Sequence, residues 1–95
     1  MNMKDTYVKR MQAQLDVWDA EIKKLKAQAE AAQADAQLKY QKEVAELRAR
    51  QRKAEEKLSE IRAASDDAWA DLKAGTDRAW DAMSDAIKAA TGRFK

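Results

Sequence analysis

The sequence predicts an all-α, elongated fold, and three observations support that prediction. The 95 residues contain no proline and only two glycines, Gly75 and Gly92, so few positions break or weaken a helix. Ala, Lys, Glu, Gln, Arg and Leu, the strongest helix formers, dominate the remainder. Apolar residues recur at spacings of three and four along nearly the whole chain. We therefore expect an elongated coiled coil, with one long helix followed by a shorter helix, as a helical hairpin or a near-continuous rod.

The first predicted helix covers about residues 3–63, within a segment of residues 1–64. Its apolar seam follows a seven-residue repeat, which favours a left-handed supercoil with a partner helix. The seam runs through Val8, Met11, Leu15, Trp18, Ile22, Leu25, Ala29 and Ala32, and resumes with Tyr40, Val44, Leu47, Gln51, Ala54, Leu58 and Ile61. The two stretches join through Ala36 by steps of four, a stutter that locally unwinds a supercoil. From Ala29 to Ala36 the seam is alanine only, so this part buries the least apolar area.

A boundary between two segments is predicted near Ser65. Every glutamate precedes Ser65, and every acidic residue after it is an aspartate. Ser and Asp are good N-caps, and Asp in a first helical turn interacts favourably with the helix dipole. We expect a break or tight turn at residues 63–67, with a new helix from about residue 66. The alternative is a helix that runs straight through, because this stretch has neither glycine nor proline.

The second predicted helix covers about residues 66–91, within a segment of residues 65–95. Two series of residues repeat there at a spacing of eleven: Leu72, Met83 and Phe94, and Trp69, Trp80 and Thr91. An eleven-residue period is typical of a straight or slightly right-handed helix. We interpret Gly75 as a tolerated interior glycine. Gly92 is interpreted as a C-terminal cap, followed by a frayed end at residues 93–95.

Homo-oligomerisation is predicted from the length of the first seam. A helix of about 60 residues is about 90 Å long, and a second helix of about 27 residues covers only its later part. The earlier part of the seam would stay exposed, which implies association. The predicted oligomer interface consists of Val8, Met11, Leu15, Trp18, Ile22, Leu25, Tyr40, Val44, Leu47, Leu58, Ile61, Trp69, Leu72, Trp80 and Met83. The mixed seam does not fix the order of the oligomer, and an unidentified protein partner remains an alternative.

The sequence points to no catalytic, cofactor-binding or metal-binding residues, and we expect a non-enzymatic protein without cofactors. There is no cysteine and no histidine, so a thiolate nucleophile and the commonest metal ligand and general base are missing. The carboxylate pairs Glu55/Glu56 and Asp66/Asp67 are neighbours in sequence. Side chains at adjacent helical positions point in different directions, so neither pair converges on one substrate atom.

Two binding roles are the alternatives to a purely structural role. Trp18, Trp69 and Trp80 are interpreted as core residues rather than membrane anchors, because the polar face of the second helix is acidic whereas surface-binding helices are usually basic. Residues 48–53 form the densest basic patch, but glutamates flank it. A solvated helix face is favoured there, and no nucleic-acid partner is expected. A membrane surface remains the less favoured alternative.

A soluble, cytoplasmic protein is the default expectation. No apolar leader segment follows the first residues. No run approaches the roughly 18 apolar residues needed to span a bilayer.

Three stretches of the chain are similar to a family of short bacterial coiled-coil proteins: residues 1–22, 40–48 and 65–75. The most specific elements are Leu-Asp-x-Trp at residues 15–18 and Trp-x-x-Leu-Lys-x-Gly at residues 69–75. Members of this family are usually labelled coiled-coil domain or stress-response proteins, without a defined activity. The resemblance covers nearly the whole chain and implies a cytoplasmic bacterial protein connected with stress. We therefore expect a self-associating coiled-coil protein of the bacterial stress response; the alternative is an amphipathic-helix module that binds lipid or other apolar surfaces.

Overall fold

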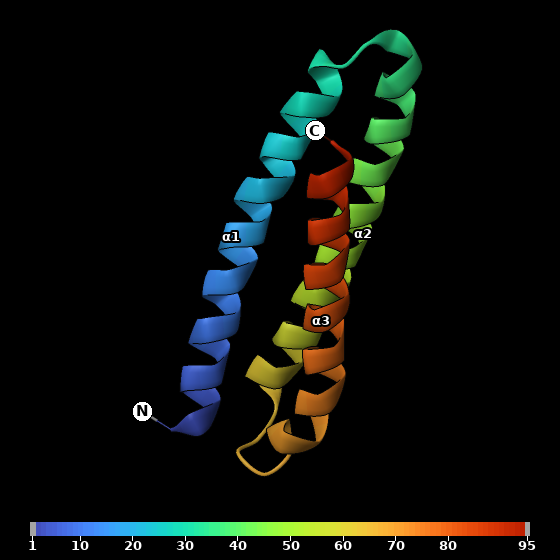
Figure 1. Ribbon diagram of the computed structural model, residues 1–95. Coiled ribbons are helices and arrows are strands. Elements are labelled where there is room, and N and C mark those ends of the chain that lie inside the picture. The colour runs from blue at the N-terminus through green and yellow to red at the C-terminus, as the bar shows by residue number, and fades with distance from the viewer. Residues whose placement is uncertain (1, 95) are drawn as a thin grey trace.

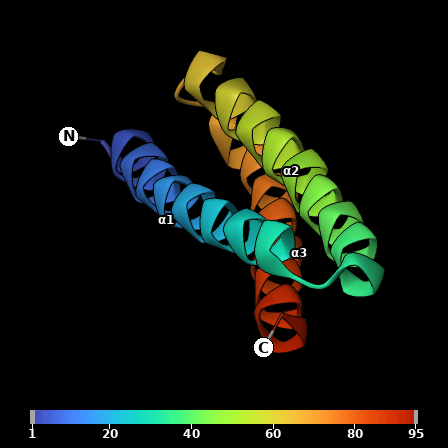
Figure 2. The same cartoon turned by 90° about the horizontal axis from the view of Figure 1, so that it is seen from above.

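The computed structural model describes residues 2–94 as three helices that run up, down and up in an elongated bundle (Figure 1). Helix α1 spans Met3–Ala31, α2 spans Ala34–Ala63 and α3 spans Trp69–Arg93. The view from above places the three helices around one common interior (Figure 2). The bundle measures 51 × 19 × 18 Å, and its radius of gyration is 15.4 Å. A compact globule of this length has a radius of gyration of about 12 Å, so the prediction of an elongated all-α fold is confirmed.

The first predicted helix is in fact two helices, because the chain turns back at Ala32 and Gln33. Both residues have an extended backbone, with φ −71° and ψ 160° at Ala32 and φ −63° and ψ 153° at Gln33. The expectation of one unbroken helix over residues 3–63 is therefore wrong at these two positions, which we call the hinge. Breaking here gives helices of 29, 30 and 25 residues, and each can bury its apolar face against the other two.

The predicted break near Ser65 is present, and the serine itself holds the turn. Helix α2 ends at Ala63, and the Ser65 carbonyl accepts hydrogen bonds from the N–H groups of Ala68 and Trp69 at 3.1 Å. The Ser65 hydroxyl accepts a further bond from the Ala68 N–H at 3.2 Å. Residues 66–68 form a turn, so α3 begins slightly later than predicted.

The prediction for one glycine is confirmed, and the prediction for the other is wrong. Gly75 lies in the interior of α3, as predicted. Gly92 is helical and has no positive φ, so its interpretation as a C-terminal cap is wrong. The last described turn is not frayed, because the Phe94 ring is buried and stacks on Tyr40 with ring centroids 4.3 Å apart. Lys95 lies outside the described residues.

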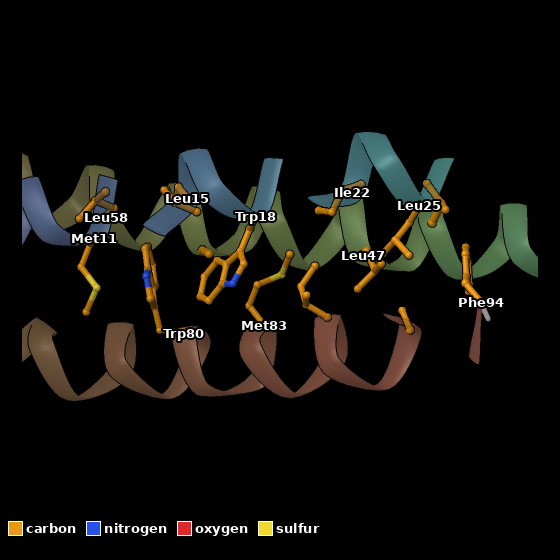
Figure 3. Close-up of a cluster of buried hydrophobic side chains, with 14 of the residues drawn as sticks. Met11, Leu15, Trp18, Ile22, Leu25, Leu47, Leu58, Trp80, Met83 and Phe94 are labelled. Carbon is orange, nitrogen blue, oxygen red and sulfur yellow. The ribbon is translucent and has the colours of Figure 1, made fainter. Parts of the chain in front are cut away.

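One apolar core runs the length of the bundle. Figure 3 shows Trp18, Trp80 and Met83 meeting in the interior between α1 and α3, with the two indole centroids 5.8 Å apart. On α3 the buried positions follow steps of four and three: Thr76, Trp80, Met83, Ile87, Ala90 and Phe94. Thr91 is exposed, so the tryptophan series at a spacing of eleven ends at Trp80. The buried face of α3 therefore follows a heptad-like pattern over about its last five turns.

Candidate functional site

The predicted interface residues all pack within one chain. Four of them are half-buried against the core, and these are Val8, Tyr40, Trp69 and Leu72. Eleven are buried, and these are Met11, Leu15, Trp18, Ile22, Leu25, Val44, Leu47, Leu58, Ile61, Trp80 and Met83. The expectation that the early seam stays uncovered is wrong, because α2 and α3 fold over it. Association through these residues stays a prediction, and it now requires the bundle to open.

The sequence reasoning missed four core positions: Tyr7, Thr76, Ile87 and Ala90. A signal for three of them was present, because Thr76, Ile87 and Ala90 fall on a three-and-four spacing with Trp80 and Met83. The eleven-residue spacing of the two tryptophans is a competing pattern, and it does not include these three positions. Tyr7 is buried instead of its half-buried neighbour Val8, because its hydroxyl reaches a carboxylate on α3.

A polar cluster joins α1 to α2 at the middle of the bundle. Arg48 donates to Asp19 Oδ1 at 2.7 Å, and the Gln51 amide donates to the same oxygen at 3.0 Å. Lys23 pairs with Asp19 Oδ2 at 2.9 Å. The hydrogen bond from Gln51, together with those from Lys23 and Arg48, holds the pKa of the Asp19 carboxyl well below its usual range. The buried Gln51 is thereby satisfied, and the cluster fixes the register of α1 against α2.

A second polar cluster joins α1 to α3. The Tyr7 hydroxyl donates to Asp77 Oδ1 at 2.6 Å, and Lys73 pairs with Asp77 Oδ2 at 3.1 Å. Burial, the hydrogen bond to Asp77 and the charge of Asp77 all raise the pKa of the Tyr7 phenol. Burial alone would raise the pKa of Asp77, but the bonds from Tyr7 and Lys73 and the charges of Lys73 and Arg10 outweigh it and lower that pKa.

The remaining cross-helix polar contacts lie at the two ends of the bundle. Lys4 of α1 donates to the carbonyl groups of Arg62 and Ala64, which closes the C-terminal end of α2. At the opposite end Arg93 of α3 pairs with Glu43 of α2 at 3.0 Å. The three ionisable groups with shifted pKa values among the described residues, Tyr7, Asp19 and Asp77, therefore all take part in contacts that bridge helices.

Neither a metal-binding cluster nor a membrane-spanning helix is found in the described part of the chain. Within residues 2–94, no three His, Cys, Asp or Glu side chains are arranged to hold a metal ion. The pairs Glu55/Glu56 and Asp66/Asp67 are exposed on the surface. In the same range, no helix combines the length and the apolar character that a membrane span requires.

The most distinctive surface feature is a groove of about 330 Å³ between α2 and α3, which we call the basic groove. Its walls carry four cations, Arg50, Lys53, Lys57 and Arg78. Its floor is made of small residues of α3, Gly75, Ala79 and Ala82. The basic patch predicted at residues 48–53 is thus divided by the fold, since Arg48 faces Asp19 on α1 while Arg50 and Lys53 line this groove.

Comparison of the chain with protein-family models, with curated proteins and with solved structures finds no match.

Proposed function

We propose that this protein is a non-enzymatic helical bundle that self-associates by exchanging α1 between two copies. The observation that supports this proposal is the hinge at Ala32 and Gln33. The resemblance to bacterial coiled-coil stress proteins extends the proposal to the stress response of a bacterial cell. Within one closed bundle the apolar seams are already covered, so association has to begin with the opening of this connection.

The hinge has little support from its own sequence beyond one side-chain hydrogen bond across it, from the Gln37 amide to the Glu30 carbonyl at 3.0 Å. It contains neither glycine nor proline, and the Gln33 side chain makes no capping hydrogen bond. Its φ angles of −71° and −63° already match the α-helical value of about −63°. Two ψ rotations, from 160° and 153° to the helical value of about −42°, therefore convert the turn into helix. The surrounding stretch, residues 29–37, consists of Ala, Gln, Glu and Asp and has high overall helix propensity because of its alanines.

A straight hinge joins α1 and α2 into one helix of about 60 residues, about 90 Å long. Helix α1 then leaves its own bundle and takes the equivalent place in a second copy, which is a domain swap. The bonds of Asp19 to Arg48 and of Tyr7 to Asp77 form again, now between chains. The alanine seam from Ala29 to Ala36 of the two chains meets at the centre of the dimer, where small side chains allow close approach.

Heating is expected to accelerate this exchange, which fits a role in stress. Detaching α1 exposes Trp18 and Ile22, so it resembles partial unfolding. Unfolding rates rise about three- to sixfold for each 10 °C. A bundle that refolds on cooling in the presence of many copies would then be trapped as swapped dimers.

The alternative, binding of lipid or another apolar surface by exposed amphipathic helices, has weaker support. Trp18 and Trp80 are buried, and Trp69 is half-buried against Tyr7 with ring centroids 5.6 Å apart. These apolar faces cover one another, so a lipid surface would have to compete with the core of the bundle itself.

Gln33→Pro tests the proposal. Proline suits the hairpin, because Gln33 has φ −63° and Ala32 has the extended backbone required before proline. In a straight helix the same proline removes a hydrogen bond and clashes with the preceding turn, at a cost of about 3 kcal/mol or more. Light scattering after size exclusion, before and after heating at high concentration, is expected to show dimers for the natural chain and monomers for Gln33→Pro.

Gln33→Ala is the matched control, because alanine at this position favours the straight helix. Its dimer fraction should equal or exceed that of the natural chain. A natural chain that stays monomeric after heating, or a Gln33→Pro variant that dimerises equally well, would refute exchange through the hinge.

A further inference from the structure

We propose that the basic groove between α2 and α3 binds an acidic amphipathic helix of a partner protein. The groove does not depend on the exchange of α1, because α2 and α3 stay together in the closed bundle and in the swapped dimer alike.

The walls carry positive charge that the chain does not neutralise. Over residues 2–94, Arg50, Lys53 and Arg78 form no ion pair, and Lys57 has only a long contact of 3.9 Å with Glu60 on its own helix. Elsewhere among the described residues some cations are paired closely, as in Arg48 with Asp19, and others, such as Lys24, form no ion pair. The groove is distinguished by four cations that surround one hollow. Four cations around one concave surface concentrate a positive potential that favours an anionic partner.

The floor is kept low by a glycine that neither packing nor backbone geometry demands. A Cβ atom added at Gly75 would meet nothing within 4 Å, and the residue has no positive φ. Glycine inside a helix nevertheless costs about 1 kcal/mol relative to alanine. With Ala79 and Ala82 it forms a stripe of small residues parallel to the helix axis, which lets another helix approach closely.

The groove has the length and the charge pattern of a helix-binding surface. Arg50 also lines a second, separate hollow between α2 and α3, together with Glu43, Glu46, Ala86, Ala90 and Arg93. From Gly75 to Ala90 the two hollows follow α3 for about 22 Å, or four helical turns. Arg50, Lys53 and Lys57 lie at the i, i+3, i+7 spacing that carboxylates on one face of a partner helix would also have. Glu43 in the second hollow is paired with Arg93, whereas Glu46 forms no ion pair within residues 2–94. Glu46 therefore sets a direction, with the acidic half of the partner beside Lys57.

A helix fits these observations better than a bare polyanion does. Phosphate groups need only the cations and would gain nothing from a low floor of Gly75, Ala79 and Ala82. A partner helix uses both features, because its small or apolar stripe meets the floor while its carboxylates meet the walls. The occupied groove would then resemble a four-helix bundle.

The test is a titration of the labelled full chain with a synthetic acidic helix of about 18 residues, long enough to span the groove. The peptide carries an alanine stripe flanked by glutamates. The two glycine amides serve as reporters in heteronuclear NMR spectra, because Gly75 lies in the floor and Gly92 lies outside the groove. A saturable shift of the Gly75 signal is expected, while the Gly92 signal stays in place.

Two variants separate the contributions of charge and floor. Lys53→Glu with Arg78→Glu should weaken binding by about tenfold. The control Lys24→Glu with Lys39→Glu makes the same change in net charge at exposed sites that do not line the groove, and should bind normally. Gly75→Leu keeps every charge but fills the floor, and it should also weaken binding.

Three results would overturn the proposal. The first is the absence of a saturable Gly75 shift with the acidic helix. The second is an equal shift with single-stranded DNA or inorganic polyphosphate that Gly75→Leu leaves unchanged, which would define a plain anion surface. The third is a concentration-dependent shift without peptide, which would place a second copy of this chain in the groove.

Discussion

Replacing Gly75 by alanine should make the bundle more stable, by an amount that follows from the structure. Gly75 is helical, and an added Cβ atom meets nothing within 4 Å, so the methyl group brings no steric cost and little new burial. What remains is the difference in helix propensity, about 1 kcal/mol in favour of alanine. For a domain of this size that corresponds to a rise of roughly 4–8 °C in Tm.

Thermal unfolding followed by far-ultraviolet circular dichroism measures this rise. Gly92→Ala is a useful comparison, because an alanine Cβ is equally free of contacts there. Gly92 lies next to the last residue of α3, where helices fray, so its replacement should give a smaller gain. If Gly75→Ala leaves Tm unchanged or lowers it, the added methyl group meets an obstacle. The floor of the basic groove would then not be open at Gly75.

Further predictions concern the core and the polar cluster between α1 and α2. Met83→Ala should lower the free energy of unfolding by about 2–5 kcal/mol in urea denaturation, because the side chain is fully buried. Leu38→Ala is the control and should change it by no more than about 0.5 kcal/mol, because Leu38 is 75% exposed. Equal effects of the two variants would contradict the packing of the core. The lowered pKa of Asp19 means that its contribution to stability is present above the ordinary Asp value of about 3.9 and is lost as the pH falls through the lower, folded-state pKa. Asp19→Asn should flatten this acid loss in a pH series of thermal melts, whereas an unchanged pH profile would show that the cluster does not hold α1 to α2.

The sequence predicted the buried faces of α1 and α2 well, because a regular apolar spacing is itself the physical cause of burial. Met11, Leu15 and Trp18 on α1 and Leu58 and Ile61 on α2 all lie in the core. An amphipathic helix has only one face that can leave water, so the residues on it can be named without knowing what covers them.

The hinge could not be predicted from local sequence, because nothing at Ala32 or Gln33 opposes a helix. The turn is instead stabilised by the packing of all three helices. An unbroken helix would leave the early seam, including Trp18 and Ile22, in water, and a break at this position covers it with α2 and α3. The break falls where the seam is alanine only, so the turn sacrifices little apolar burial.

The basic groove could not be predicted from the sequence, for a different reason. Arg50 and Lys53 were visible as part of a basic run, but Arg78 belongs to another helix, and its place beside them depends on the register of α2 against α3. That register is held by contacts at the end of the bundle, where Arg93 pairs with Glu43 at 3.0 Å and Tyr40 stacks on Phe94. Both contacts involve residues that the sequence had assigned to a frayed end or to an oligomer interface.

The properties of the hinge connect the failed prediction of one long helix with the proposed function. Residues 29–37 have a high helix propensity, which is why the sequence predicted an unbroken helix. In the closed bundle, packing of α1 against α2 and α3 outweighs this propensity at Ala32 and Gln33. The swapped dimer that we propose would keep almost all of the helix-to-helix contacts of the closed monomer. Their free-energy difference therefore reduces to three contributions: the helical hydrogen bonds regained at two straightened hinges, the alanine contact at the centre, and the entropy lost on association, about 4–15 kcal/mol. The first two are small and the third depends on concentration, so the number of copies and the residue at position 33 should decide which form prevails.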